Sequence, residues 1–321
     1  MKFVIDGGTT NMRISLLKED GTLVDQLKFD AGVRRTAIDG HKGYLVETLK
    51  NGLKTLMEKH DVHEVSDCIA YGMITSNMGL VEIPHLCAPV GAKELHDGME
   101  SHLFADIAPF PIRFIRGVRN FAGPVTLDNA AGMDMMRGEE TEAAGLVALR
   151  PDVKNAMIVL PGSHNKFIPI DGEGRIMGCM TSISGELLDS LTHHTILADA
   201  VEHGFASAET YSAPHMLAGA KAADAGLGRA AFTARILRTL GDLTVEEARS
   251  FLLGTVLRLD LEALRQYAPD VKHLLVAGKP PLGTALCDLF AAYGYEAEAL
   301  PEEIQKKMGI AGACAIAQGE C

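Results

Sequence analysis

Asp6-Gly7-Gly8-Thr9-Thr10-Asn11 joins two short apolar runs, residues 2–6 and 12–17, at the start of the chain. Such runs predict strands, and paired glycines permit a tight hairpin between them. The glycines leave backbone N–H groups uncovered and the polar side chains add donors, so the turn suits phosphate oxygens. Asp6, at the strand end, can hold Mg²⁺ through water. A plain turn is equally compatible with this spacing, and the stretch is neither a Rossmann fingerprint nor a P-loop.

A second polar hairpin lies in the other half of the chain. Leu160-Pro161-Gly162-Ser163-His164-Asn165-Lys166 ends the apolar run 156–160 and precedes another. Lys166 can reach a phosphate as a point charge, whereas a histidine such as His164 more often completes a turn. Two such hairpins that face each other would hold the β- and γ-phosphates of ATP from both sides, so the pair is more specific than either alone.

The order of predicted elements repeats. In the first half we expect strands and helices over residues 2–6, 12–17, 21–29, 40–59 (helix), 68–71, 113–115 and 139–149 (helix). In the second half we expect strands over 156–160, 167–170, 175–179 and 273–277, helices between 184 and 266, and a final helix–strand–helix run. This duplication predicts an α/β protein whose domains, 1–150 and 151–321, face each other across a central cleft.

Composition narrows the class of protein. The 321 residues carry 30 Lys+Arg and 42 Asp+Glu, a net charge of −12, which argues against nucleic acid or an anionic membrane as a partner. No run of about 18 apolar residues or signal-peptide pattern is present. The six cysteines are scattered without a C-x-x-C pair, which favours a reduced, cytoplasmic protein over disulfides or zinc. The oligomeric state stays open, a homodimer included.

Three further stretches carry polar chemistry. Arg137-Gly138-Glu139 opens an alanine-rich helix, where a carboxylate could accept the proton of an attacking hydroxyl. The loop Gly72–Gly79, with Thr75, Ser76 and Asn77, offers hydrogen bonds to a polyhydroxylated molecule. Gly278-Lys279 follows a strand and opens a helix, so an adenosine could lie against bare backbone. Taken singly, each stretch is also compatible with acidic residues at an ordinary helix start or with an ordinary loop.

Together these motifs resemble the superfamily of sugar kinases, actin and heat-shock ATPases, with its two ribonuclease-H-like, actin-like ATPase domains. Within it, four stretches are similar to the 2-dehydro-3-deoxygalactonokinase family: Asp6–Arg13, Gly72–Asn77, Asp134–Thr141 and Leu160–His164. The Met-Arg-Gly-Glu-Glu-Thr string is the specific one. Leu80, His85 and Phe167 stand where the family pattern leads us to expect aromatic residues, Trp at the last.

The resemblance implies ATP- and Mg²⁺-dependent phosphorylation of the C6 hydroxyl of 2-dehydro-3-deoxy-D-galactonate, an intermediate of galactonate catabolism. By position Glu139 is the expected base and Asp134 the second choice. Arg34, Arg35 and Arg137 are candidates for the substrate carboxylate, with Arg137 also placed at the catalytic centre. The expected nucleotide contacts are Asp6 (also the metal ligand), Gly7, Gly8, Thr9, Thr10, Asn11, Arg13, Gly162, Ser163, His164, Lys166, Gly278 and Lys279.

Two alternatives remain. A kinase for another sugar or sugar acid would share every motif above. A nucleotide-switch ATPase without a small-molecule acceptor would share the two hairpins, although this chain is shorter than such proteins. A sugar-responsive repressor of the superfamily would need an N-terminal helix-turn-helix, and the first predicted strand begins by Lys2.

Overall fold

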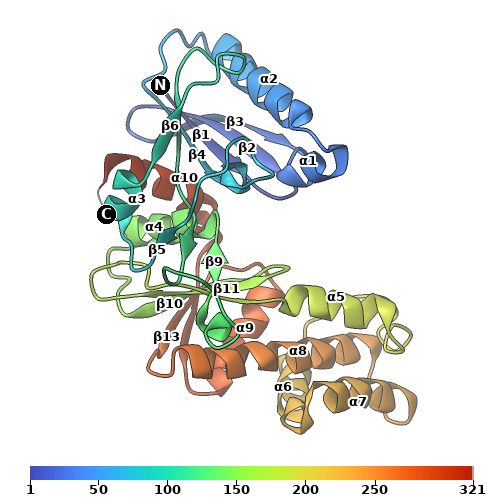
Figure 1. Cartoon of the computed structure of the whole chain (residues 1–321). Helices are drawn as coiled ribbons and strands as arrows, with labels where there is room; N and C mark the ends of the chain where they lie inside the picture. Colours follow the sequence, from blue (N-terminus) through green and yellow to red (C-terminus); the bar gives the residue numbers. More distant parts are fainter. Residues whose placement is uncertain (320–321) are drawn as a thin grey trace. The chain divides into compact units, whose positions relative to one another are not determined.

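The computed structural model describes residues 1–319 and divides them into two compact units (Figure 1). The first unit holds residues 1–154, 170–179 and 306–319. The second holds residues 155–169 and 180–305. The sequence does not indicate that residues 170–179 and 306–319 pack with residues 1–154.

The first unit is built on a six-stranded sheet in the order β3-β2-β1-β4-β7-β6. Its strands are β1 (Lys2–Gly7), β2 (Met12–Leu17), β3 (Leu23–Phe29), β4 (Asp67–Gly72), β6 (Glu100–His102) and β7 (Ile112–Phe114). β1 and β4 are parallel with Gly7 opposite Gly72, so both strands end at the same edge. The polar turns that follow them therefore lie together.

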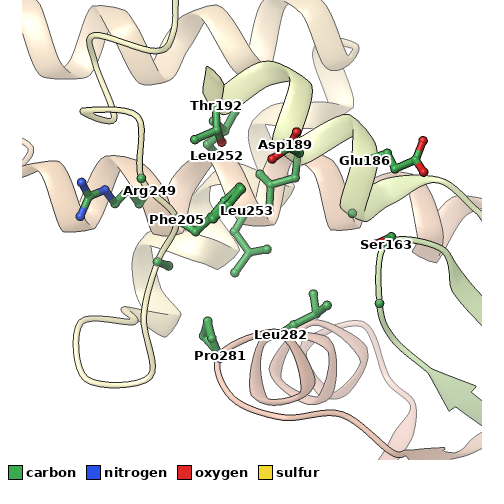
Figure 2. Close-up of a pocket in the computed structure, with 15 residues that line it drawn as sticks. Ser163, Glu186, Asp189, Thr192, Phe205, Arg249, Leu252, Leu253, Pro281 and Leu282 are labelled. Atoms are coloured by element: carbon green, nitrogen blue, oxygen red, sulfur yellow. The ribbon is translucent and has the colours of Figure 1, made fainter. Parts of the chain in front are cut away.

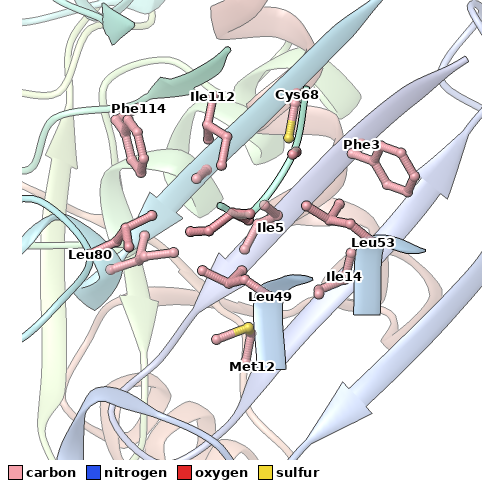
Figure 3. Packing of buried hydrophobic residues seen from close by; sticks show 14 of the residues in the cluster. Phe3, Ile5, Met12, Ile14, Leu49, Leu53, Cys68, Leu80, Ile112 and Phe114 are labelled. Carbon is pink, nitrogen blue, oxygen red and sulfur yellow. The ribbon is translucent and has the colours of Figure 1, made fainter. Parts of the chain in front are cut away.

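The first unit also contains helices, of which α2 (Gly43–Lys59) packs against the sheet. They are α1 (Val33–Asp39), α2, α3 (Ala92–Asp97), α4 (Glu139–Leu149) and α10 (Glu302–Gln318), of which the part from Lys306 belongs to this unit. A small sheet of β5 (Leu86–Cys87), β8 (Val118–Arg119) and β9 (Met135–Met136) leads into α4. In the core, Ile5 and Ile14 of the large sheet pack with Leu49 and Leu53 of α2 (Figure 3).

The second unit has a five-stranded sheet in the order β12-β11-β10-β13-β14. The strands are β10 (Ala156–Leu160), β11 (Asn165–Ile170), β12 (Met180–Ser182), β13 (His273–Val276) and β14 (Glu296–Ala299). The helices are α5 (Ser184–His194), α6 (Ala213–Ala222), α7 (Leu227–Thr239), α8 (Val245–Tyr267) and α9 (Leu282–Ala292). α8 begins at a capping box between Thr244 and Glu247, and its leucines pack against the sheet.

The strand expected over 175–179 is wrong. β11 pairs instead with β12, and Ile176 makes only single bridges, to Val90 and Ile170. The reason is local, because the Asp171 carboxylate accepts hydrogen bonds from the backbone N–H groups of Glu173 and Arg175 at 2.8 and 2.9 Å. These donors are thereby removed from any sheet ladder, and Gly178, at a φ of 138°, then bends the chain out of strand geometry.

Across residues 1–319 no helix is both long and apolar enough to cross a bilayer. The five cysteines in this range, Cys68, Cys87, Cys179, Cys287 and Cys314, are free thiols. Cys321 lies outside the described residues.

Candidate active site

A pocket of about 460 Å³ lies beside the second hairpin, wholly within the second unit (Figure 2). One wall is apolar and is formed by Phe205, Leu252, Leu253, Pro281 and Leu282. Glu186, Asp189 and Thr192 line it from α5, at a three-residue spacing that keeps them on one helix face. A cavity of this size, mostly apolar with a few polar groups, has the character of a small-molecule site.

The second hairpin borders this pocket through Gly162 and Ser163. It packs so tightly on the start of α5 that a Cβ at Gly185 would lie 2.3 Å from the Gly162 carbonyl oxygen. The backbone N–H of Glu186 donates to the Ser163 carbonyl at 3.2 Å. Ser163 itself is exposed, so its hydroxyl and backbone N–H are accessible to a ligand at the pocket edge.

Two other parts of the second unit support the hairpin. A Cβ at Gly278 would lie 2.3 Å from Cγ of Pro161, so this bare glycine serves the packing of the hairpin. The pocket wall after β13 is formed by Pro281 and Leu282, while Lys279 is exposed outside the lining. The predicted adenosine loop therefore reaches the pocket three residues later than Gly278-Lys279.

The charged residues of the second hairpin differ in exposure. Lys166, on β11, is only 5% exposed and donates a hydrogen bond to the Thr181 hydroxyl of β12. His164 is exposed, and its Nε2 lies 2.9 Å from Glu186 Oε1, which joins the hairpin to the pocket wall. Lys166 thus contributes positive charge from beneath the hairpin, and His164 acts at its surface.

The first hairpin is held by its carbonyl oxygens. Backbone N–H groups at the start of α1 donate to Gly8, Thr9 and Thr10: Val33 to Gly8 at 3.2 Å, Arg34 to Thr9 at 2.9 Å and Gly32 to Thr10 at 2.8 Å. Thr9, Thr10 and Asn11 are exposed. Among residues 1–319 the N–H groups of Thr9 and Thr10 have no partner, so they are available to an anion.

Three glycines bring the candidate catalytic elements together in the first unit. A Cβ at Gly72 would lie 2.9 Å from the Gly7 carbonyl and 3.8 Å from Asp6 Oδ1. A Cβ at Gly138, just before α4, would lie 3.4 Å from Gly72 Cα. Asp6 at the end of β1 and Glu139 at the start of α4 therefore belong to one region, with the start of the Gly72–Gly79 loop between them.

Carboxylates dominate this region. Asp6 is paired with Arg13 at 2.7 Å, and burial raises the Asp6 pKa although the arginine works against that shift. Burial, followed by the charge of Glu139, raises the pKa of Glu140 to about 7. Burial, followed by the charge of Asp6, raises the pKa of Glu142 to about 8. Near neutral pH, Glu142 is therefore largely protonated and Glu140 is divided between its two forms.

Glu139, like Asp6 and Glu142, is partly exposed. Its Oε2 accepts the backbone N–H of Arg137 at 3.0 Å, which fixes the carboxylate at the helix start. The neighbouring Glu140 points inward, is fully buried, and accepts the Gly138 N–H at 2.7 Å. Asp134 lies before β9 and accepts the N–H of Met135 at 2.6 Å.

The Arg137 side chain holds the Gly72–Gly79 loop. Its guanidinium donates to the Thr75 carbonyl and hydroxyl, both at 2.6 Å, and to the Ile83 carbonyl at 3.0 Å. His85 Nδ1 lies 3.3 Å away, and burial beside this cation lowers the His85 pKa to about 4, so the neutral ring can accept. Thr75 and Ser76 are buried, whereas Asn77 is exposed.

The remaining arginine candidates lie on α1. Arg34 is exposed next to the first hairpin, to which its backbone is bonded. Arg35 is paired with Asp39 at 2.8 Å and stacks over the ring of Tyr44 at 5.4 Å. Of the two side chains, that of Arg34 is the one not engaged by another group within the described residues.

The family described as 2-keto-3-deoxy-galactonokinase matches residues 6–316 of the chain, which span the hairpins, the Gly72–Gly79 loop and the start of α4. The chain belongs to this family. It is 24% identical to DgoK1 of Rhizobium meliloti (strain 1021), named a probable 2-dehydro-3-deoxygalactonokinase, over 96% of this chain and 95% of that one. It is also 24% identical to the 2-dehydro-3-deoxygalactonokinase of Escherichia coli (strain K12), over 95% and 94%.

The fold agrees with that membership. The crystal structure of a candidate 2-dehydro-3-deoxygalactonokinase from Sinorhizobium meliloti superposes with a TM-score of 0.77 at 21% identity, covering 98% of both chains. The expected mixed α/β fold is thereby confirmed, and the family match over residues 6–316 confirms the galactonokinase family membership expected from the four motif stretches.

For a kinase of this family, two groups of residues were not indicated by the sequence. The pocket wall of Phe205, Leu252 and Leu253 comes from a loop and helix whose pattern is that of an ordinary core. Asn165 and Asp260 form a buried hydrogen bond of 2.7 Å across 95 residues of chain, and no local pattern announces such a pair. Asn165 at least stands inside the second hairpin, where a polar residue at the start of a strand is a weak signal.

Proposed function

We propose that this kinase transfers the γ-phosphoryl group of ATP to the C6 hydroxyl of 2-dehydro-3-deoxy-D-galactonate. The new bond joins O6 to phosphorus, the bond between the γ-phosphorus and the bridging oxygen breaks, and ADP leaves. The observation that carries the proposal is the family match over residues 6–316. A pocket of nucleoside size at the edge of a phosphate-type hairpin supports it independently.

The nucleoside is expected in the pocket of the second unit. An adenine ring is flat and apolar on its faces, which suits the wall formed by Phe205, Leu253 and Leu282. Ribose hydroxyls are donors, and Glu186 and Asp189 supply acceptors along α5. Ser163 at the rim would meet the phosphates.

The first hairpin is expected to supply further phosphate donors through Thr9, Thr10 and Asn11. Mg²⁺ fits the chemistry here only as an ion held largely by phosphate and water, because in residues 1–319 no group of three acidic, histidine or cysteine side chains is arranged to hold a metal ion. Asp6, 25% exposed and paired through Oδ2 with Arg13, has a second oxygen for a water-mediated contact. When bound, the ion would neutralise phosphate charge.

Glu139 is the proposed general base. It stands at the start of α4, in the same region as Asp6, and is more accessible than the fully buried Glu140. In this role its carboxylate takes the proton of the C6 hydroxyl as the O6–phosphorus bond forms. Asp134 is the second candidate.

The sugar acid is expected at the Gly72–Gly79 loop. Asn77 is the exposed polar side chain there and can bond substrate hydroxyls. Arg34 is the proposed partner for the substrate carboxylate, because Arg35 is paired and Arg137 is used to hold the loop. The setting we propose is reducing and cytoplasmic, because the six cysteines of the sequence are scattered without a C-x-x-C pair.

A coupled ADP-release assay tests this function. It should be run with 2-dehydro-3-deoxygalactonate, other ketohexonates and hexonates, and neutral sugars as acceptors. We expect release only with acceptor present and fastest with the first compound. Release that does not depend on an acceptor would indicate a nucleotide-switch ATPase. Equal turnover of a neutral sugar would contradict acid specificity.

A further inference from the structure

A buried polar group lies beneath the second hairpin and is not part of the pocket lining. We call it the Asp260 cluster: Asn165, Ser182, Ser184 and Asp260. Asp260 and Asn165 are 0% exposed and Ser184 is 3% exposed. Asp260 stands on α8, far along the chain from the hairpin.

Both carboxylate oxygens of Asp260 are held by donors. Its Oδ2 accepts from Asn165 Nδ2 at 2.7 Å, and its Oδ1 accepts from the Ser184 hydroxyl at 2.6 Å. Burial raises the Asp260 pKa, while hydrogen bonds from Ser182, Ser184 and Asn165 oppose that shift. A carboxylate in an apolar interior is costly, so this one imposes strict requirements on its partners.

One arm of the cluster ends on the hairpin backbone. An amide that gives its Nδ2 to Asp260 can present only its oxygen on the other side. Asn165 Oδ1 indeed accepts the Gly162 N–H at 3.0 Å. The carboxylate therefore fixes which way the amide points, and the amide fixes the first residue of the turn.

The other arm ends on α5. Ser184, the first residue of this helix, donates to the same carboxylate. The helix start touches the hairpin directly, since Glu186 N–H bonds to the Ser163 carbonyl at 3.2 Å. Asp260 thus connects both backbones that border the pocket at Gly162, Ser163, Gly185 and Glu186.

We infer that Asp260 is a positioning residue for nucleotide binding: it sets the hairpin through Asn165 and the start of α5 through Ser184, without touching the nucleotide. The inference rests on the proposed function, because it assumes that the pocket binds ATP. Its measurable consequence is a change in the affinity for ATP that spares the affinity for the sugar acid.

An Asp260→Asn substitution is the sharpest perturbation, because it keeps size and changes one acceptor into a donor. If the new amide gives its oxygen to Ser184, its NH₂ faces the NH₂ of Asn165. Rotating the Asn165 amide removes that clash but turns its NH₂ against the Gly162 N–H. These two arrangements leave one buried donor without an acceptor. If the new amide instead gives its oxygen to Asn165, its NH₂ must donate to the Ser184 hydroxyl, which then donates to Ser182 instead of to residue 260. This third arrangement replaces bonds to a carboxylate by neutral ones and reverses the bond that holds the start of α5.

Combining Asp260→Asn with Asn165→Asp restores the wild-type set of hydrogen bonds, with the negative charge moved from position 260 to position 165. A carboxylate at position 165 accepts from both the Gly162 N–H and the new amide, whose oxygen still accepts from Ser184. We expect Asp260→Asn to raise the KM for ATP about tenfold or more with the KM for the sugar acid within twofold. The double variant should recover most of that loss.

Thr255→Val is the matched control. Thr255 is also buried on α8, and its hydroxyl donates to the Gly219 and Phe251 carbonyls, away from the hairpin. It should lower the thermal midpoint and leave both KM values unchanged. Ser184→Ala removes only the α5 arm and gives a milder variant in case Asp260→Asn does not fold.

Three results would overturn the inference. The first is a wild-type KM for ATP in folded Asp260→Asn, or in Ser184→Ala if Asp260→Asn does not fold. The others are a folded double variant whose KM for ATP is not restored, and a Thr255→Val variant whose KM for ATP shifts as much as that of Asp260→Asn. Calorimetric titration with ADP should reproduce the ranking without catalysis. If the wild-type protein binds ADP but forms no ADP from ATP with any acceptor, the proposed function is wrong. The order of ADP affinities among the variants would still test the role of Asp260.

Discussion

Glu139 and Asp134 differ in setting, and that difference makes the base assignment testable. Glu139 begins α4 and is held by the Arg137 N–H, so Gln at this position keeps an acceptor but cannot take a proton. We expect Glu139→Gln to lower kcat by about 10²–10⁴ and to leave the KM for ATP within twofold. Asp134→Asn is the comparison variant and should keep near-normal turnover; the opposite ranking would move the base to Asp134.

A second residue-scale expectation concerns pH and stability. The pKa of Glu142 is raised from 4.5 to about 8 in the folded chain, so the native state holds a proton that the unfolded state releases. For a carboxyl whose folded pKa is raised, the free energy of unfolding falls as pH increases from about 4.5 to about 8. The slope is at most about 1.4 kcal/mol per pH unit for this group.

Urea unfolding at pH 5, 6, 7 and 8 measures this slope. Glu142→Gln should flatten it and leave the variant more stable than wild type at pH 8. Glu58→Gln serves as the control, because Glu58 is 68% exposed and its pairing with Lys54 contributes little. An unchanged slope in Glu142→Gln would show that this carboxyl is not the titrating group.

At the scale of elements, the crossing of α4 and α10 depends on glycine. A Cβ at Gly312 would lie 1.8 Å from the Thr141 carbonyl oxygen, and one at Gly145 would lie 1.8 Å from that of Met308. The glycines at these positions permit this close approach. Gly312→Ala must push the two backbones apart, and overpacking of this kind costs about 1–3 kcal/mol.

Gly228→Ala is the matched control for that substitution. Gly228 lies near the start of α7, and a Cβ there would meet nothing within 4 Å. We expect a neutral or slightly stabilising effect, because alanine restricts the unfolded chain. Thermal unfolding of both variants checks the comparison, and equal midpoints would contradict the tight crossing.

Sequence patterns predicted the elements that depend on local spacing. The runs 12–17 and 156–160 and the helix 139–149 match β2, β10 and α4 residue for residue, because alternation or continuous burial is recorded in neighbouring residues. Residues 80–135 form β5, α3, β6, β7, β8, a 3-10 turn at Ala130–Gly132, the start of β9 and loops, where only Arg113–Ile115 was expected. Strands of two or three residues are too short for a period to be visible.

The candidate site divides in the same way. Exposed donors in glycine turns, such as Thr9 and Ser163, are visible in the sequence because the turn chemistry is local. The commitment of Arg137 to Thr75 and Ile83 is not, since it depends on how a later segment packs on the Gly72–Gly79 loop. Long-range partners such as Asp260 are invisible for the same reason.

At the scale of the whole molecule, each unit carries its own core and its own candidate site, which predicts where ligands change dynamics. The sugar acid alone should slow hydrogen exchange in the first unit, chiefly over residues 72–85. ADP alone should slow it in the second unit, over 161–165, 184–192 and 249–253, where the pocket is lined.

Exchange measured by mass spectrometry at saturating ligand, with a neutral hexose as the control compound, distinguishes these patterns. The neutral hexose tests whether protection depends on the charge of the ligand. Both the sugar acid and ADP are anions, which the net charge of −12 of the chain repels. Protection must therefore come from local donors: exposed hairpin N–H groups, Arg34 and the buried Lys166. Protection by ADP that spared residues 161–165 and 184–192 would contradict the nucleotide site proposed here, whatever the kinase assay showed.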